Sequence, residues 1–317
     1  MEYLILILSL AGIVLGADFL VKGAVVVARK CRVSSFVIGA VIVGIGTSLP
    51  ELVVSTVGAI GGNSEVAIGN VVGSNIFNVF AILGLTALFF PIAVSRENMK
   101  FEIPFCIAVS VLLMLLVYNF FVGGEPRLGR WDGAALFLVF TSFMWISLRR
   151  GKSSAATVGE SVEEVNKSLW FAAFSILGGL AALIVSSNFF VDEAVAIARK
   201  LGVSDAFISI TLLACGTSLP ELAASVTAAV KKDTDMALGN IIGSNIFNAT
   251  MILGTASLIT PLTTGKIGLV DYGAMILAAV LPMIFGIRGK ITRIEGLLML
   301  LCYAAYTWYI VTYVMAV

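Results

Sequence analysis

The chain has 317 residues and a net charge of +1, and 59% of its residues are hydrophobic while only 12% are charged. A soluble domain has about 25% charged residues, so most of this surface must face lipid rather than water. The absence of histidine excludes histidine-based catalytic triads and metal sites. The four cysteines stand singly without a CxxC pair, which offers neither a zinc site nor a dithiol motif.

Ten apolar stretches are each long enough for a helix that crosses a hydrocarbon layer of roughly 30 Å. They cover residues 4–27, 36–60, 66–90, 101–122, 131–148, 168–198, 206–230, 236–259, 269–287 and 294–316. The one long polar segment, 151–167, separates five stretches from five. The sequence therefore predicts an all-α polytopic membrane protein with a first unit over 1–150, a linker over 151–167 and a second unit over 168–317.

The basic residues predict the orientation of these spans in the membrane. Of the 20 Lys and Arg residues, 14 lie in connections that follow odd-numbered spans and five lie in connections that follow even-numbered spans. Because loops rich in Lys and Arg stay in the cytoplasm, both termini are expected outside and the central linker inside. A bacterial-type cell (inner) membrane is the expected location.

The second half of the chain repeats the first with a shift of 170 residues. The segment GTSLPEL at 46–52 recurs unchanged at 216–222, and GNVVGSNIFN at 69–78 recurs as GNIIGSNIFN at 239–248. Each copy holds five predicted spans, and because five is odd the second copy enters the membrane from the opposite side. Inverted repeats of this kind are typical of transporters, which place the substrate site near the midplane between the copies.

Two glutamates lie in the middle of apolar spans, at equivalent positions of the two copies. A charge there costs at least about 2.5–3.5 kcal/mol, yet Glu51 and Glu221 are both present. A pseudo-two-fold axis could bring them face to face, where two carboxylates would repel each other or take up protons. A bound cation would remove both problems.

The neighbouring residues are rich in oxygen ligands. Pro50 and Pro220 lack an N–H and must open the helix, which frees main-chain carbonyls. Hydroxyl and amide oxygens surround each glutamate in sequence or lie on the next span: Thr47, Ser48, Ser74, Asn75 and Asn78 in the first copy, and Thr217, Ser218, Ser244, Asn245 and Asn248 in the second. An all-oxygen set with two carboxylates suits a hard cation such as Ca²⁺, whereas Mg²⁺ would resist losing its water.

Structural interpretations of the same residues stay open at this point. Ser48-x-x-Glu51 also fits a capping box at the start of a helix. Asn70 and Asn240 can be structural hydrogen-bonding residues. The glycine pairs Gly69-x-x-x-Gly73 and Gly239-x-x-x-Gly243 are typical of close helix packing. Asp18 lies in the first span, but its repeat mate is asparagine, which makes it a weak site candidate.

The paired GTSLPE and GNxxGSNxxN segments resemble the two α-repeats of the sodium/calcium exchangers, in the cation/Ca²⁺ exchanger superfamily and of prokaryotic type. The resemblance covers essentially the whole chain. It implies ten helices that are broken at the midplane, an ion-binding core formed by spans two, three, seven and eight, and spans one and six that slide across this core.

The resemblance also implies a set of ligands. Ten side chains are assigned to the ion site by position: Thr47, Ser48, Glu51, Ser74, Asn78, Thr217, Ser218, Glu221, Ser244 and Asn248. The main-chain carbonyls of Gly44 and Ala214 join them, and Ca²⁺ would lie between the two glutamates and the carbonyls of Thr47 and Thr217. Some family members and the potassium-dependent relatives have an acid at the position of Asn248, so asparagine there argues against K⁺ co-transport.

We therefore expect a secondary active antiporter, not an enzyme, that exchanges Na⁺ for Ca²⁺ and normally extrudes Ca²⁺. Its partners would be the two ions and the lipid bilayer, with no cofactor, no nucleic acid and no evident protein partner. Alternatives are an antiporter for H⁺ and Ca²⁺ or another divalent cation, a channel, and an intramembrane hydrolase. A hydrolase would need a nucleophile or catalytic dyad outside the symmetric repeats, and the sequence offers none.

Overall fold

The computed structural model describes residues 2–119, 125–151, 168–202 and 214–314. Within these ranges, eight helices are long and apolar enough to cross a membrane. A ninth span results if Ser35–Thr47 and Leu49–Ile60, which meet at a bend of 47°, are taken together. A shorter apolar helix, Leu219–Val230, occupies the end of the predicted span 206–230.

The helices follow the predicted apolar stretches closely, and π-helical turns, labelled η, interrupt several of them. The helical elements are α1 (Glu2–Cys31), α2 (Ser35–Ile38), η1 (Gly39–Gly44), α3 (Ile45–Thr47), α4 (Leu49–Ile60), α5 (Ser64–Phe77), η2 (Asn78–Leu83), α6 (Gly84–Phe89), η3 (Asn98–Glu102), α7 (Ile103–Tyr118), α8 (Arg130–Gly151), α10 (Leu169–Lys200), α12 (Ala214–Gly216), α13 (Leu219–Val230), α14 (Thr234–Phe247), η6 (Asn248–Ile252), α15 (Leu253–Ile259), α16 (Leu269–Gly286), α17 (Arg293–Tyr309) and η7 (Ile310–Val314). Outside the described residues lie 152–167 of the predicted linker, 206–213 of the seventh predicted span, and the ends of the fourth and tenth, 120–122 and 315–316.

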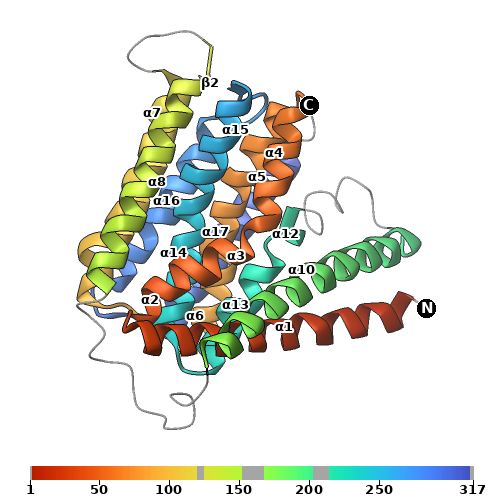
Figure 1. The fold of residues 1–317 in the computed structure, drawn as a ribbon. Coiled ribbons are helices and arrows are strands. Elements are labelled where there is room, and N and C mark those ends of the chain that lie inside the picture. Colours follow the sequence, from red (N-terminus) through yellow and green to blue (C-terminus); the bar gives the residue numbers. More distant parts are fainter. Residues whose placement is uncertain (1, 120–124, 152–167, 203–213, 315–317) are drawn as a thin grey trace.

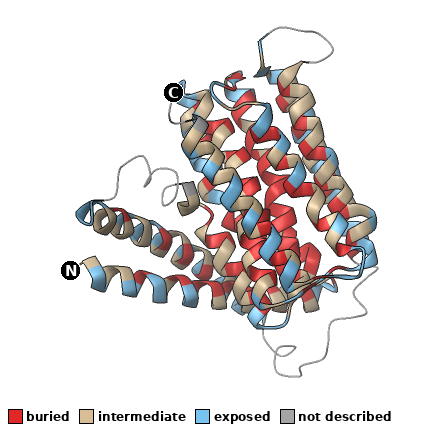
Figure 2. Ribbon diagram, turned by 180° about the vertical axis from the view of Figure 1, so that it is seen from behind, coloured by how far each residue is buried: buried red, intermediate tan, exposed pale blue. Residues whose placement is uncertain are grey.

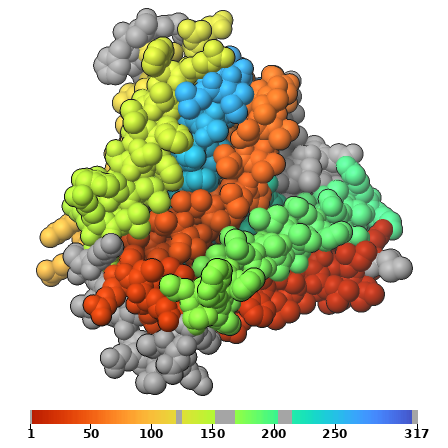
Figure 3. Space-filling view, in the orientation of Figure 1, coloured from red at the N-terminus to blue at the C-terminus, as the bar shows by residue number. Residues whose placement is uncertain are grey.

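Helices α1 and α10 form a slanted pair that projects from the rest of the bundle (Figures 1 and 3). Small residues permit their close crossing, because a Cβ on Gly16 would lie 2.9 Å from the carbonyl oxygen of Gly179. Most of the outward surface of this pair is exposed and apolar, with Leu4, Leu8 and Phe174 among the exposed side chains. Such an exposed apolar surface is typical of helices that face lipid.

The buried centre of the molecule consists of α5 with η2 and of α14 with η6, each surrounded by other helices (Figure 2). Helix α14 packs directly on the backbone of α2 and η1. A Cβ on Gly239 would overlap the carbonyl oxygen of Phe36, and one on Gly243 would overlap Ala40. This confirms the predicted packing role of Gly239 and Gly243, and it brings η1 beside the polar residues of α14. The same prediction is wrong for Gly69 and Gly73, because a Cβ on Gly73 would meet nothing within 4 Å and one on Gly69 would meet the Ile267 side chain at 3.3 Å instead of a helix backbone.

Four two-residue strands depart from the all-helical prediction. Strand β1 (Ile92–Ala93) pairs antiparallel with β4 (Lys290–Ile291), and β2 (Arg127–Leu128) pairs antiparallel with β3 (Leu262–Thr263). Each ladder joins a connection of the first half to a connection of the second half. Segments this short have no hydrophobic periodicity, so nothing in the sequence pattern indicates them.

Candidate cation-binding site

The helix breaks lie where the sequence places proline after a Thr-Ser pair. Ser48 separates α3 from α4, and Thr217 and Ser218 separate α12 from α13. Ser48 and Ser218 have similar backbone angles of φ −84°, ψ 9° and φ −92°, ψ 8°. Pro50 and Pro220 then stand in the first turn of α4 and α13. The capping-box interpretation of Ser48 is wrong, because its side chain makes no bond to the first turn of α4.

Instead, the two serines hydrogen-bond the glutamates of the opposite half. Ser48 Oγ donates to Glu221 Oε1 over 2.7 Å, and Ser218 Oγ donates to Glu51 Oε1 over 2.9 Å. Both glutamates are fully buried. The second oxygen of each carboxylate, Oε2, is buried without a hydrogen-bond partner in the protein. Glu51 and Glu221 are therefore each bonded to the helix break of the opposite half, and each has one buried carboxylate oxygen without a hydrogen-bond partner.

Oxygens from α5 and α14 lie against the same breaks. Ser74 Oγ lies 3.4 Å from Ser218 Oγ, and Ser244 Oγ donates to the carbonyl of Gly44 over 3.2 Å. Asn78 and Asn248, one turn further on, are fully buried, and the Oδ1 atom of each has no hydrogen-bond partner. Both asparagines begin a π-helical turn, a feature that is frequent at functional sites.

Not every predicted oxygen is free to bind a cation. The Gly44 carbonyl accepts hydrogen bonds from the Ser48 N–H over 3.1 Å and from Thr47 Oγ1 over 3.4 Å, besides the one from Ser244. Thr47 Oγ1 also lies 3.3 Å from Asn240 Oδ1. Ala214 begins α12 just before the break at Ser218, and Thr217 lies at that break.

Asn70 and Asn240 have the structural role that the sequence left open. Asn70 Nδ2 donates to the main-chain carbonyl of Glu51 over 3.3 Å and to Ser55 Oγ over 3.0 Å. Asn240 does the same with the carbonyl of Glu221 over 3.2 Å and Ser225 Oγ over 2.8 Å. These bonds fasten each glutamate-bearing helix to its neighbour. The motifs of the sequence do not include Ser55 and Ser225, and their equivalent positions in the two repeats are the one signal that indicates them.

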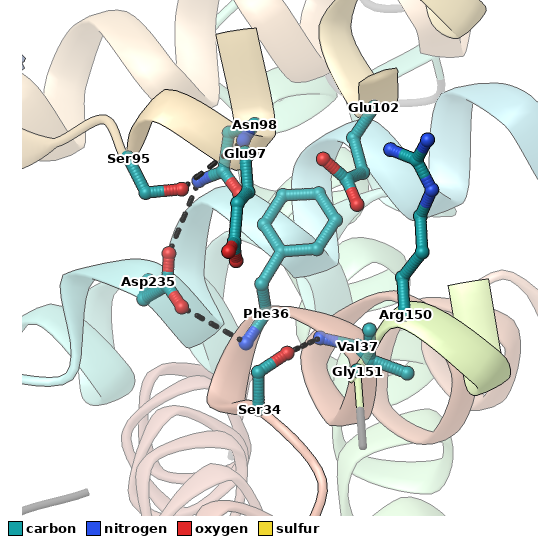
Figure 4. Close-up of a pocket in the computed structure, with 10 residues that line it drawn as sticks. All are labelled: Ser34, Phe36, Val37, Ser95, Glu97, Asn98, Glu102, Arg150, Gly151 and Asp235. Carbon is teal, nitrogen blue, oxygen red and sulfur yellow. Dashed lines mark hydrogen bonds between the residues drawn. The ribbon is translucent and has the colours of Figure 1, made fainter. Parts of the chain in front are cut away.

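A second polar region lies apart from the glutamates. A cavity of about 290 Å³ opens between α2, η3, α8 and α14, and the side chains of Glu97, Glu102, Arg150 and Asp235 line it (Figure 4). The Asp235 carboxylate accepts hydrogen bonds from the Phe36 N–H over 3.2 Å and from Asn98 Nδ2 over 3.1 Å. At 1.5 Å per residue, Asp235 is about 13 Å along α14 from Ser244. This cavity borders the start of α2 and is separate from the glutamate site.

Asp18 does not reach the site either. Its carboxylate forms ion pairs with Lys22 and with Lys231, each with an N–O distance of 2.6 Å. Lys231 directly follows α13, so this contact joins the slanted pair to the bundle.

Helices broken beside paired buried acids, in a bundle of apolar spans, define a polytopic membrane transport protein rather than an enzyme. The family model described as sodium/calcium exchanger protein matches residues 1–149 and 171–312. The chain belongs to the sodium/calcium exchanger family.

Individual relatives agree with this assignment over nearly their whole length. The chain is 37% identical over 316 residues to a putative antiporter, CaxA, of Alkalimonas amylolytica, covering 95% of this chain and 97% of the relative. It is 34% identical to the sodium/calcium exchanger MaX1 of Methanosarcina acetivorans, with coverage of 96% and 97%. Among solved structures, the sodium–calcium exchanger NCX_Mj superposes with a TM-score of 0.84 at 32% identity, covering 98% of each chain.

Proposed function

We propose that this protein exchanges Na⁺ for Ca²⁺ across the cell membrane, with Glu51 and Glu221 jointly holding the ion. The observation that supports this most directly is the pair of buried carboxylates, each hydrogen-bonded through one oxygen only. A buried polar atom without a partner is costly, and more so when it is charged. A cation between the two glutamates would satisfy both oxygens, and one Ca²⁺ or two Na⁺ would balance two negative charges.

The surrounding donors favour Ca²⁺ as the divalent substrate. The proposed ligands are oxygens of Glu51, Glu221, Asn78 and Asn248, with the Thr47 and Thr217 carbonyls completing the shell. Ca²⁺ accepts six to eight such oxygens in flexible geometry. The hydroxyls of Ser48, Ser74, Ser218 and Ser244, together with the Gly44 and Ala214 carbonyls, would serve the Na⁺ positions when hydrogen bonds rearrange.

The proposal includes ten spans arranged as two inverted units, 1–150 and 168–317, which a cytoplasmic linker over 151–167 connects. Both termini then face outside. The reciprocal serine–glutamate bonds and the two reciprocal strand ladders support a two-fold relation between the halves. Alternating access would come from movement of the α1–α10 pair across the core, because this pair projects from the bundle in which the two glutamates lie (Figure 1).

Ion exchange in proteoliposomes tests the proposal. Purified protein is reconstituted into vesicles loaded with Na⁺, K⁺, choline or a proton gradient, and ⁴⁵Ca²⁺ uptake is measured in each. We expect uptake with internal Na⁺ and none with K⁺ or choline. Uptake that follows the proton gradient without Na⁺ would identify a proton-coupled antiporter instead, and uptake that needs no counter-ion would identify a channel.

A further inference from the structure

Asn75 and Asn245 connect the two halves of the core, although their sequence positions suggested only further oxygen ligands. Asn75 Nδ2 donates to the main-chain carbonyl of Asn245 over 3.1 Å, and Asn245 Nδ2 donates to the main-chain carbonyl of Asn75 over 3.1 Å. Both side chains are buried. A carbonyl oxygen can only accept, so the nitrogen of each amide must face the opposite backbone, which fixes the direction of its Oδ1 atom.

These two Oδ1 atoms are occupied by the next asparagine of the opposite half. Asn248 Nδ2 donates to Asn75 Oδ1 over 3.1 Å, and Asn78 Nδ2 donates to Asn245 Oδ1 over 3.0 Å. The amide nitrogens of Asn78 and Asn248 are therefore used in these bonds. Their Oδ1 atoms remain on the other side of each amide, buried and without a partner.

Asn78 lies on the helix face that borders the glutamates. Ser74 and Asn78 are four residues apart and share one face. Ser74 Oγ lies 3.4 Å from Ser218 Oγ, which in turn donates to Glu51. On α14, Asn248 shares a face with Ser244, which bonds the Gly44 carbonyl beside the other break.

We propose that Asn75 and Asn245 are positioning residues that hold Asn248 and Asn78 with their carbonyl oxygens, and not their NH₂ groups, toward the transported cation. The Oδ1 atom of each accepts the hydrogen bond that orients the neighbouring amide, so the proposed role of Asn75 and Asn245 is to position a ligand rather than to bind the ion. Without this anchor an asparagine amide can rotate by half a turn and present a donor to the cation, which would weaken binding. The inference rests on the proposed function, since it concerns the same ion site.

Two replacements at position 75 separate anchoring from mere volume. Asn75→Leu keeps the approximate size of the side chain but loses both of its hydrogen bonds. We expect the apparent KM for Ca²⁺ in the ⁴⁵Ca²⁺ assay to rise roughly tenfold, which is the size of effect that follows from losing a hydrogen bond at a charged site. The maximal rate should change less than the KM. Asn75→Gln retains an amide that can donate to the Asn245 carbonyl and accept from Asn248. Its KM should stay closer to that of the wild type than the KM of the leucine variant, and a KM raised as much by Asn75→Gln as by Asn75→Leu overturns the inference. If the leucine variant does not fold, the double-mutant cycles with Asn245→Leu still test it.

Double-mutant cycles then distinguish positioning from general packing. Asn75→Leu should raise the KM in the wild type and in Asn78→Ala, but should add little in Asn248→Ala, whose amide has already been removed. Asn245→Leu should show the opposite dependence, with its effect abolished in Asn78→Ala and retained in Asn248→Ala. Equal effects in all backgrounds would overturn the inference.

The cycles are read only against the wild type in the same vesicles. If the wild type shows no Na⁺-dependent uptake, the proposed function is wrong and the positioning role falls with it. If the wild type exchanges normally but the double-mutant cycles show no coupling between Asn75 and Asn248 or between Asn245 and Asn78, only the positioning role is wrong.

Discussion

Ser48 Oγ donates a hydrogen bond of 2.7 Å to Glu221 Oε1, although 173 residues separate them along the chain. The mate of this bond, from Ser218 to Glu51, measures 2.9 Å. Each glutamate is thus oriented by the helix break of the opposite half. A change at either break must therefore affect a carboxylate that lies on a different helix.

The first prediction concerns this bond. Removing a hydrogen bond to a charged group costs about 1.5–3 kcal/mol, so Ser48→Ala should raise the apparent KM for Ca²⁺ by roughly 10- to 150-fold. Ser218→Ala should act similarly. The measurement is ⁴⁵Ca²⁺ uptake into Na⁺-loaded proteoliposomes over a range of Ca²⁺ concentrations.

Ser55→Ala is the matched control, because Ser55 is an equally buried serine of α4 whose hydroxyl bonds Asn70 and the Ala67 carbonyl rather than a glutamate. It should leave the KM for Ca²⁺ within a few-fold of the wild type. If Ser55→Ala raised the apparent KM for Ca²⁺ as much as Ser48→Ala, then the packing of α4, and not the serine–glutamate bond, would determine the affinity for Ca²⁺.

The second prediction concerns topology. With five spans in each half, the equivalent turns after α4 and α13 should lie on opposite faces of the membrane. Asn63 and Lys232 are exposed in these turns. After replacement of the four native cysteines, Asn63→Cys should react with an impermeant thiol reagent added outside intact cells, and Lys232→Cys should react only after the membrane is opened. Labelling of both from the same side would contradict the inverted arrangement.

Most of the fold follows from hydrophobic span length. The stretch predicted at 131–148 is α8 (Arg130–Gly151), and the one at 269–287 is α16 (Leu269–Gly286). The first helix extends beyond the predicted 4–27 to Glu2–Cys31, because its last turn contains Arg29 and Lys30, which hydropathy counts as loop. Polar helix ends outside the hydrocarbon are invisible to a search for apolar residues.

The candidate site is predictable only in part. The repeat indicated that Glu51 and Glu221 meet, because equivalent positions approach each other across a pseudo-two-fold axis. Repetition alone does not determine which groups bond across that axis, so the partner of Ser48 and the crossed amide bonds of Asn75 and Asn245 came from the structure. The ion pair between Asp18 and Lys231 could not be predicted either, because Lys231 lies in a turn far away in the sequence. The repeat gives no hint of this pair, since the equivalent residues, Asn188 and Gly61, are uncharged.

That asymmetry leads to the third prediction. If α1 slides against the core, the Asp18–Lys231 ion pair stabilises one of the two orientations of the transporter. The equivalent residues of the opposite repeats, Asn188 and Gly61, are uncharged and cannot form the same ion pair in the second orientation. Exposed ion pairs contribute about 0.2–1 kcal/mol. Lys231→Ala should therefore shift the balance between the orientations, so that the apparent KM for Ca²⁺ falls at one membrane face and rises at the other by up to about fivefold.

The apparent KM for Ca²⁺ at each membrane face can be measured in vesicles into which the protein is inserted in one known orientation. Lys232→Ala, which removes an exposed neighbouring charge, is the control and should leave the ratio of the two constants unchanged. If Lys231→Ala moves both constants in the same direction, the ion pair affects the ion site or stability instead of the conformational balance.

The fourth prediction concerns transported charge. The two glutamates balance one Ca²⁺ or two Na⁺, so a further Na⁺ held by neutral Ser, Asn and main-chain oxygens would leave the loaded site positive. Moving that charge is worth about 2.3 kcal/mol per 100 mV. A membrane potential clamped positive inside should accelerate ⁴⁵Ca²⁺ uptake into Na⁺-loaded vesicles relative to vesicles clamped at zero. Na⁺-dependent uptake that ignores the potential would indicate electroneutral exchange and exclude the additional Na⁺.

The most direct test of the account replaces the two buried glutamates singly with glutamine. Glu51→Gln and Glu221→Gln preserve size but remove a negative charge that one Ca²⁺ needs for balance. Glu65→Gln serves as the control, since Glu65 lies at the start of α5 and accepts the Lys266 N–H through Oε1, an oxygen that glutamine retains. Na⁺-dependent ⁴⁵Ca²⁺ exchange should be abolished in both core variants, which still reach the membrane as folded protein, and retained in Glu65→Gln. Near-normal exchange by either Glu51→Gln or Glu221→Gln would contradict the shared cation site.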